Sequence, residues 1–539
     1  MMQIDRYNSL VILSALAAST ANAEPSKSVE KPNILVVVCE DISSYLGCYG
    51  DKVAVTPHLD HFSSEGILHS HMFTCVGVSA PSRYSLITGR YSSTDGANYM
   101  RSNYFNKDFE AIPPSEVKCY TELLRANGYY CTNNAKTDYQ FKAPVAAWDE
   151  QGGKAHWKNT PEGMPFLSIF NLNVTHESFI WKNGDKSLTV NPADIILPPY
   201  YPDNEIVRHD MAVMYSNIAK MDKQFQNLLD EVEAAGIADN TIIIFYSDNG
   251  GPLPRGKREL KDSGTKVPFM IRFPDRRGAG TINPDLNMFV DIPATILSLA
   301  GVEIPKYLHG QPMYGKLASK TPKRKYVYGA TDRFDEQIEK RASIRDSRYQ
   351  YIYNYMPEMS IYKPVAFRLQ MPMMRNMLEL YEADKLDEKQ RLWFDAPAAQ
   401  EELYDCIADP HQVNNLATRP EYSSLLKKMR KSYRKEWIDA YNKDWERFTE
   451  QEFIDRMWKT GTKPQTETPV IKLNGNQLSV ENLSKGYSIS YQINGKGLQG
   501  YSEHWMLYTF PVLLHKGDEI SIVAERLGYE KSEIVSFAY

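Results

Sequence analysis

Ser79 lies in the run Ser79-Ala80-Pro81-Ser82-Arg83, whose residue types favour anion binding. Pro81 suits the first turn of a helix, because the N–H that proline lacks would have no partner there. Ser79 is therefore expected at a helix N-terminus, where free backbone N–H groups and the helix dipole attract a sulfate or phosphate. Arg83, about one helical turn later, would reach the same anion. Taken alone, the run is explained more simply as a structural helix cap.

Two pairs of polar residues end apolar runs of the sequence. Glu40 and Asp41 follow PNILVVVC, and Asp248 and Asn249 follow TIIIFYS. Burying charged acids at the ends of such strands costs free energy unless a cation or several hydrogen bonds compensate their charge. Their oxygen ligands suit Ca²⁺ or Mg²⁺ rather than zinc or copper. Either pair alone fits a cap or a turn, but the two pairs together favour a metal site.

A sheet of buried strands must position these residues. The run that follows Lys31 is continuously apolar, which is typical of a strand buried on both faces. Helical patterns alternate with strand patterns after it and predict a doubly wound α/β sheet with right-handed crossovers. In such sheets ligands bind at the carboxyl ends of the strands, and both polar pairs fall at strand ends. The helical patterns are PHLDHFSSEG, EVKCYTELLRANG and MYSNIAKMDKQFQNLLDEVEAAG.

The run from Ser79 to Arg83, continued by Leu86 and Thr88-Gly89-Arg90, resembles the signature of the type I sulfatases. In that family a Cys or Ser at the first position is oxidised to formylglycine. The similarity extends to PNILVVVCED, TPHLD, LLRANGYYCTNNAK, YSDNG and GTKVPFMIRFP, and YDCIADPHQVNNLA resembles a later segment. It implies an alkaline-phosphatase-like α/β sulfatase fold: a large mixed, mostly parallel sheet flanked by helices, a smaller C-terminal α+β subdomain and a terminal β-sandwich module.

The resemblance also implies roles for individual residues. A divalent cation, Ca²⁺ or Mg²⁺, would be held by Glu40, Asp41, Asp248, Asn249 and oxidised Ser79. Arg83 would fix and activate the formylglycine, and Lys136, His176 and Lys257 would hold the sulfate. In the implied mechanism the hydrated aldehyde attacks sulfur in line, and His176 or a neighbouring lysine protonates the departing sugar oxygen.

The chain departs from the family pattern at three positions. Glu40 replaces the more usual Asp, which lengthens one metal ligand by a methylene group. Asp138 stands where the family often has His; this leaves His176 as the general acid, and we place Asp138 among the substrate-binding candidates. Ser79 replaces the alternative Cys, which implies a partner, a serine-type sulfatase-maturating enzyme.

Arg333, Asp335 and Glu336 form a polar cluster after the aromatic segment YVYGA. We expect Arg333, Asp335 and Glu336 to bind sugar hydroxyls, although an acidic turn at a helix start explains the cluster nearly as well. The β-rich tail and an abundance of aromatic residues, with 35 Tyr and 8 Trp, also favour a glycan. The predicted substrate is a sulfated oligosaccharide with O-sulfated galactose or hexosamine units, as in mucins and glycosaminoglycans.

Three other functions are open from the sequence. YSDNGGPLPRGKRELKDSGTK also resembles the N-sulfoglucosamine sulfohydrolases, or sulfamidases. A phosphatase or phosphonate hydrolase is less favoured, because the Ser-x-Pro-Ser-Arg setting suits formylglycine. In a noncatalytic glycan-binding protein, Ser79 would stay unmodified and the tail would supply the affinity.

The first residues predict export, because the short apolar run from Leu10 to Ala18 ends in a small-residue cleavage pattern near Ala23. This run is too short to span a bilayer, so we expect a periplasmic protein with no membrane span. A net charge of -5 argues against nucleic acid as a partner. Whether Cys119 and Cys131 are bridged is not decided by the sequence. The expected divisions are a signal peptide (1–23), a catalytic domain (31–370), a C-terminal subdomain (371–463) and a β-sandwich module (466–539).

Overall fold

A large central sheet carries the apolar strands. They are β1 (Asn33–Cys39), β2 (Ile67–Phe73), β3 (Tyr130–Asn134), β4 (Glu150–Gln151), β5 (Phe166–Leu172), β6 (Thr241–Ser247), β7 (Lys266–Arg272), β8 (Thr281–Asn283) and β9 (Asn287–Met288). Their order is β4-β3-β5-β1-β6-β7-β2-β8, and β9 pairs with β2. β1 pairs in parallel with β5 and β6, whereas β7 is antiparallel to β6 and β2. The sheet is thus mixed and mostly parallel, as predicted.

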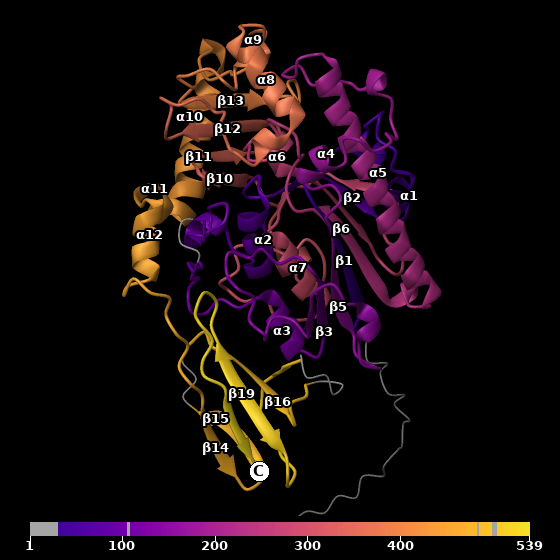
Figure 1. Cartoon of the computed structure of the whole chain (residues 1–539), viewed down its shortest axis with the longest axis vertical. Coiled ribbons are helices and arrows are strands. Elements are labelled where there is room, and N and C mark those ends of the chain that lie inside the picture. The colour runs from indigo at the N-terminus through magenta and orange to yellow at the C-terminus, as the bar shows by residue number, and fades with distance from the viewer. Residues whose placement is uncertain (1–30, 105–107, 482–484, 498–503) are drawn as a thin grey trace, which may run out of the picture. The chain divides into compact units, whose positions relative to one another are not determined.

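The computed structural model describes residues 31–104, 108–481, 485–497 and 504–539 (Figure 1). The predicted signal peptide, residues 1–23, lies outside the described residues. Among the helices that the structure describes, none combines the length and the apolar character needed to cross a membrane.

Helices cover both faces of the central sheet, because alternate residues of β1 enter opposite cores. Leu35 and Val37 pack in one core with residues of α1 and α5, whereas Val36 and Val38 pack in the other with α2, α3 and α7. This is the doubly wound arrangement predicted from the sequence. The helices are α1 (Pro57–Glu65), α2 (Ser79–Thr88), α3 (Tyr120–Ala126), α4 (Ser178–Lys182), α5 (Glu205–Ala234), α6 (Asp262–Thr265) and α7 (Asp291–Leu299).

A second, antiparallel sheet has the strand order β10-β11-β12-β13. Its strands are β10 (Val327–Phe334), β11 (Gln337–Arg345), β12 (Tyr349–Asn354) and β13 (Glu401–Asp405). Because β13 pairs with β12, this sheet spans the boundary that we predicted at residue 370. The helical elements that follow are α8 (Pro372–Glu382), α9 (Glu388–Arg391), α10 (Ser423–Ser432), a π-helix (Tyr433–Asn442), α11 (Lys443–Arg447) and α12 (Glu450–Met457).

The tail folds into two small antiparallel sheets that share a core, which fits the predicted β-sandwich. The first contains β14 (Val470–Asn474), β15 (Gln477–Glu481) and β18 (Val512–Leu513). The second contains β16 (Ser488–Ile493), β17 (Met506–Leu507), β19 (Glu519–Glu525) and β20 (Val535–Ala538). Elsewhere in the chain, Cys119 and Cys131 are both buried free thiols.

Candidate active site

The two polar pairs meet because β1 and β6 are parallel neighbours in register. Cys39, the last residue of β1, pairs with Ser247, the last residue of β6. The backbone N–H of Asp41 donates to Asp248 Oδ1 over 3.3 Å, and Asn249 Nδ2 donates to Asp41 Oδ1 over 3.0 Å. Asp41 has a φ of 51°, a left-handed conformation that is uncommon outside glycine and often marks a functional turn.

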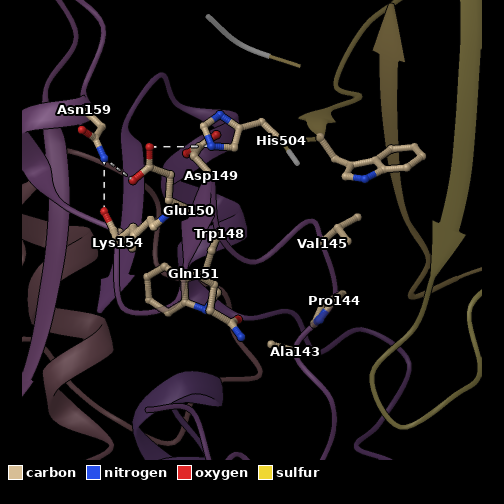
Figure 2. Close-up of a pocket in the computed structure, with 12 residues that line it drawn as sticks. Ala143, Pro144, Val145, Trp148, Asp149, Glu150, Gln151, Lys154, Asn159 and His504 are labelled. Atoms are coloured by element: carbon tan, nitrogen blue, oxygen red, sulfur yellow. Dashed lines mark hydrogen bonds and ion pairs between the residues drawn. The ribbon is translucent and has the colours of Figure 1, made fainter. Parts of the chain in front are cut away.

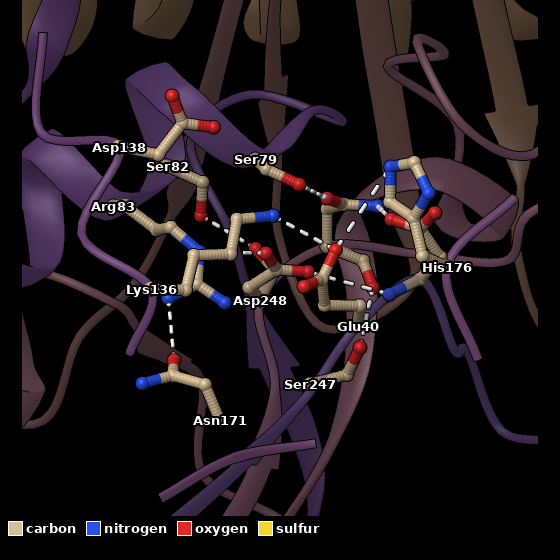
Figure 3. Close-up of polar contacts among 12 residues, drawn as sticks. Glu40, Ser79, Ser82, Arg83, Lys136, Asp138, Asn171, His176, Ser247 and Asp248 are labelled. Atoms are coloured by element: carbon tan, nitrogen blue, oxygen red, sulfur yellow. Dashed lines mark hydrogen bonds and ion pairs between the residues drawn. The ribbon is translucent and has the colours of Figure 1, made fainter. Parts of the chain in front are cut away.

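Ser79 is the first residue of α2, as the sequence predicted, and its side chain points toward the strand-end residues (Figure 3). The residue in the cap position is Val78, so the Ser79 hydroxyl does not serve as a helix cap. It donates instead to Asn249 Oδ1 over 3.0 Å. Arg83, one turn along α2, donates from Nε to Asp248 Oδ2 over 2.9 Å. The hydroxyl, the guanidinium and both polar pairs therefore form one cluster.

Two lysines that follow distant strands complete the charge pattern. Lys136, just after β3, places Nζ 2.8 Å from Glu40 Oε2. Lys257, in the loop between β6 and α6, places Nζ 2.7 Å from Asp41 Oδ2 and is almost fully buried. Because Arg83 pairs with Asp248, each carboxylate of the strand ends faces one cation. A sulfate brought to Ser79 would meet cations from three different segments of the chain.

The strand-end residues also fit a hard divalent cation. Glu40, Asp41, Asp248 and Asn249 are all buried, and their side chains offer oxygen ligands. Burial raises the pKa of Glu40, so its charged form benefits from a nearby cation. Burial also opposes the charge of Asp248, but Arg83 and the two lysines outweigh it and lower the pKa of Asp248 to about 2. The donor set matches Ca²⁺ or Mg²⁺.

His176 lies on the loop after β5, at the accessible edge of the cluster (Figure 3). Its side chain is 24% exposed, and Nε2 lies 3.9 Å from Glu40 Oε2. Burial, aided by the charge of Lys257, lowers the pKa of His176 to about 4, so the ring is neutral near pH 7. An anion bound beside the ring would favour its protonation, which is what a general acid needs.

Glu177, which we did not predict, links the basic residues of the cluster. Its carboxylate accepts two hydrogen bonds of 2.9 Å from Arg258 and lies 3.1 Å from Lys257 Nζ. Its backbone N–H donates to Asp41 Oδ2 over 2.7 Å. Together with Asp41 and His176 it forms a compact group of potential metal-ligating atoms. The consecutive cations Lys257 and Arg258 were the one signal in the sequence that a buried acid would be needed.

The remaining predicted residues lie in different surroundings. Asp138 ion-pairs with Arg101 over 3.2 Å. Asp335 lies 3.3 Å from Arg258, which in turn pairs with Glu177 of the cluster.

Arg333 is placed differently from our prediction. It is 1% exposed, and its guanidinium is bonded to both oxygens of Glu450 and to the backbone carbonyls of Met100 and Arg101. These contacts hold α12 against β10.

A separate pocket of about 510 Å³ lies between residues 143–159 and His504 and Trp505, which precede β17 (Figure 2). Its acids already have partners: Asp149 pairs with Arg125, and Glu150 accepts hydrogen bonds from Tyr130 and Asn159. None of the predicted site residues lines this pocket. The cluster around Ser79 is therefore the stronger candidate for catalysis.

Comparisons with known proteins agree with this geometry. The sulfatase family model matches residues 32–302, and a model of the N-sulphoglucosamine sulphohydrolase C-terminal region matches residues 255–390. An ulvan-active sulfatase of Formosa agariphila is 38% identical, with 95% of this chain and 92% of that protein covered. Human N-sulphoglucosamine sulphohydrolase is 23% identical, with coverages of 74% and 88%. A solved 2-O GAG sulfatase has a TM-score of 0.59 at 19% identity, with coverages of 78% and 94%.

Proposed function

This chain belongs to the sulfatase family, and we propose that it hydrolyses O-sulfate esters of glycans with a nucleophile made from Ser79. One observation carries the proposal. The Ser79 hydroxyl lies at the start of α2, bonded to Asn249 and surrounded by three buried carboxylates and their cations. The Ser79 hydroxyl donates to the amide oxygen of Asn249, which is not a base that could activate a serine, so we infer that residue 79 is oxidised to formylglycine.

We assign each residue of the cluster a role from its charge and its position. Bound Ca²⁺, or Mg²⁺, would offset negative charge on the sulfate oxygens, and Glu40, Asp41, Asp248 and Asn249 would hold it. Lys136 and Lys257 would bind the sulfate oxygens, and Arg83 would orient residue 79. His176, at the accessible edge, would protonate the leaving oxygen. Fixed charges of this kind stabilise a transition state without having to reorganise.

The substrate is proposed to be a sulfated polysaccharide or an oligosaccharide derived from it. Because the Formosa agariphila relative is named for activity on ulvan, ulvan is the first substrate to test. The galactose and hexosamine sulfates that we predicted from the sequence are the second set. Export to the periplasm and activation by a serine-type maturating enzyme belong to the same proposal.

A sulfamidase is the second candidate, since the N-sulphoglucosamine sulphohydrolase model matches residues 255–390. These residues include Lys257 and Arg258, both of which pair with Glu177. The chemistry differs only in the leaving atom, which is nitrogen instead of oxygen. Release of a free amine from N-sulfated glucosamine, with no sulfate released from O-sulfated glycans, would establish the sulfamidase.

The experiment is an assay of sulfate release from ulvan by protein co-expressed with a serine-type maturating enzyme. We expect release by the wild type and a loss of at least about 1,000-fold in Ser79→Ala, because the nucleophile is removed. Ser64→Ala, at an exposed serine of α1, is the matched control and should retain full activity. Undiminished release by Ser79→Ala would overturn the proposal.

A further inference from the structure

One aromatic ring, that of Phe367, lies beside His176 at the accessible edge of the active site, and a second ring, that of Trp181, packs against Phe367. Phe367 is 38% exposed, and its ring centroid is 6.1 Å from that of His176. Trp181, in α4, contacts Phe367 edge-to-face with centroids 5.2 Å apart and is itself partly exposed. The two rings come from segments that are far apart in the sequence, and they meet only at this edge. The contacts described above give neither ring a role in holding the metal ligands or the sulfate.

The exposure of Phe367 is imposed by its neighbours. Val365 is fully buried on one side, and Arg368 is only 3% exposed on the other. Arg368 lies over the ring of Trp393, 4.8 Å from its centroid, and the backbone N–H of Ala366 donates to Glu336 Oε1 over 2.6 Å. The backbone is therefore anchored on both sides of Phe367. Phe367 and Trp181 together therefore present an apolar surface next to His176.

The position of the rings relative to the sulfate indicates what they would contact. His176 lies between Phe367 and the cluster, since its Nε2 is 3.9 Å from Glu40 Oε2. A group attached to sulfur through the oxygen that His176 protonates would extend toward the two rings. A pyranose ring has apolar C–H faces and polar edges, so an aromatic side chain can cover one face while the hydroxyls remain hydrated. A sulfate ion alone has no apolar surface that these rings could contact.

We propose that Phe367 and Trp181 form a stacking surface for a sugar ring of the substrate, which makes Phe367 a specificity-determining residue of the sulfatase reaction. This inference rests on the proposed function and deepens it. Glu336, which we placed in a sugar-binding cluster from the sequence, acts indirectly by fixing the segment that carries Phe367.

Binding and turnover of sulfated oligosaccharides prepared from ulvan test this surface. Phe367→Ala should raise KM about three- to tenfold with little change in kcat, because stacking binds the ground state and the transition state alike. Phe367→Tyr should restore the wild-type KM. Phe510→Ala is the matched control, since Phe510 is 73% exposed and belongs to the tail module rather than to the catalytic domain. An unchanged KM in Phe367→Ala, or an equal effect in Phe510→Ala, would overturn the inference.

Calorimetric titration of the same oligosaccharides separates this inference from the proposed function. In the Ser79→Ala background, Phe367→Ala should weaken binding by the same factor, whether or not the wild type turns the oligosaccharide over. Binding that weakens without any wild-type sulfate release would support the stacking surface and contradict the proposed function. Sulfate release by the wild type, together with binding that Phe367→Ala leaves unchanged, would support the proposed function and contradict the stacking surface.

Discussion

At the scale of single residues, the active site is a set of paired charges in which Lys257, Arg258 and Glu177 each have two partners. Lys257 lies between Asp41 and Glu177, and Arg258 lies between Glu177 and Asp335. Burial opposes the charge of Lys257, but the two acids outweigh it and raise its pKa, so the ammonium stays charged. Glu177 thus positions a cation that we assign to sulfate binding.

Replacement of Glu177 tests this role. Glu177→Gln leaves Arg258 and Lys257 short of negative charge in a buried site, and we expect a loss of about 3 kcal/mol in the free energy of unfolding. Urea denaturation measures this loss. Sulfate release by the folded variant should fall at least about tenfold as Lys257 shifts. Asp203→Asn, which breaks a solvent-exposed ion pair with Arg208, is the control and should behave like the wild type. Wild-type stability and activity in Glu177→Gln would contradict the assignment.

Which of these residues a sequence can predict depends on how they are positioned. Glu40, Asp41, Asp248 and Asn249 directly follow apolar strands, so their location required only the sheet topology. Glu177 lies on an irregular loop, and nothing in the neighbouring residues indicates its burial. The sequence also does not reveal that Arg333 forms an ion pair with the distant Glu450.

At the scale of elements, the register of β1 against β6 brings the two polar pairs together, and α2 adds Ser79 and Arg83. β10, in the second sheet, carries Asp332, an acid to which we assign no role in catalysis or binding. Asp332 is 8% exposed, and burial raises its pKa from an ordinary value of 3.8 to about 7, with Glu450 adding to the effect. The folded protein therefore binds a proton at this site that the unfolded chain releases at lower pH.

The sign of the resulting pH dependence follows from the raised pKa. Between about pH 3.8 and pH 7 the folded state binds more protons at Asp332, so the contribution of this residue to stability is complete below that window and is lost as the pH rises through it. Asp332→Asn should therefore match the wild type near pH 4 and be more stable by a few kcal/mol at about pH 8. Urea denaturation across this range measures the difference. Asp194→Asn, at an exposed position, should follow the wild-type profile; a pH-independent effect of Asp332→Asn would refute the raised pKa.

Strand and helix types were predicted well where the patterns were long. The apolar runs became β1 and β6, and the helical pattern that includes MYSNIAKM became α5. The antiparallel direction of β7 was not predicted, because the composition of a buried strand is the same in either direction. The sheet from β10 to β13 was missed as a unit, since β13 lies far along the chain from the strand that it pairs with.

At the scale of the whole molecule, Pro32–Tyr539 form one compact unit, in which the central sheet, the second sheet and the tail follow one another along the chain. The second sheet supports the site from outside it. Asp335, just past β10, reaches Arg258, and Glu336 fixes the segment of Phe367. The fold class was predictable because it follows from alternating strands and helices, whereas these links between distant segments depend on tertiary packing.

The central claim is that Ser79 is a precursor whose oxidation creates the nucleophile. The most direct measurement is the mass of the peptide that contains residue 79, taken from protein that releases sulfate. We predict a peptide lighter by two hydrogen atoms than the encoded sequence, in a fraction that rises in proportion to the specific activity across preparations with and without the maturating enzyme. Protein that releases sulfate at its full rate with an intact serine at position 79 would contradict the claim.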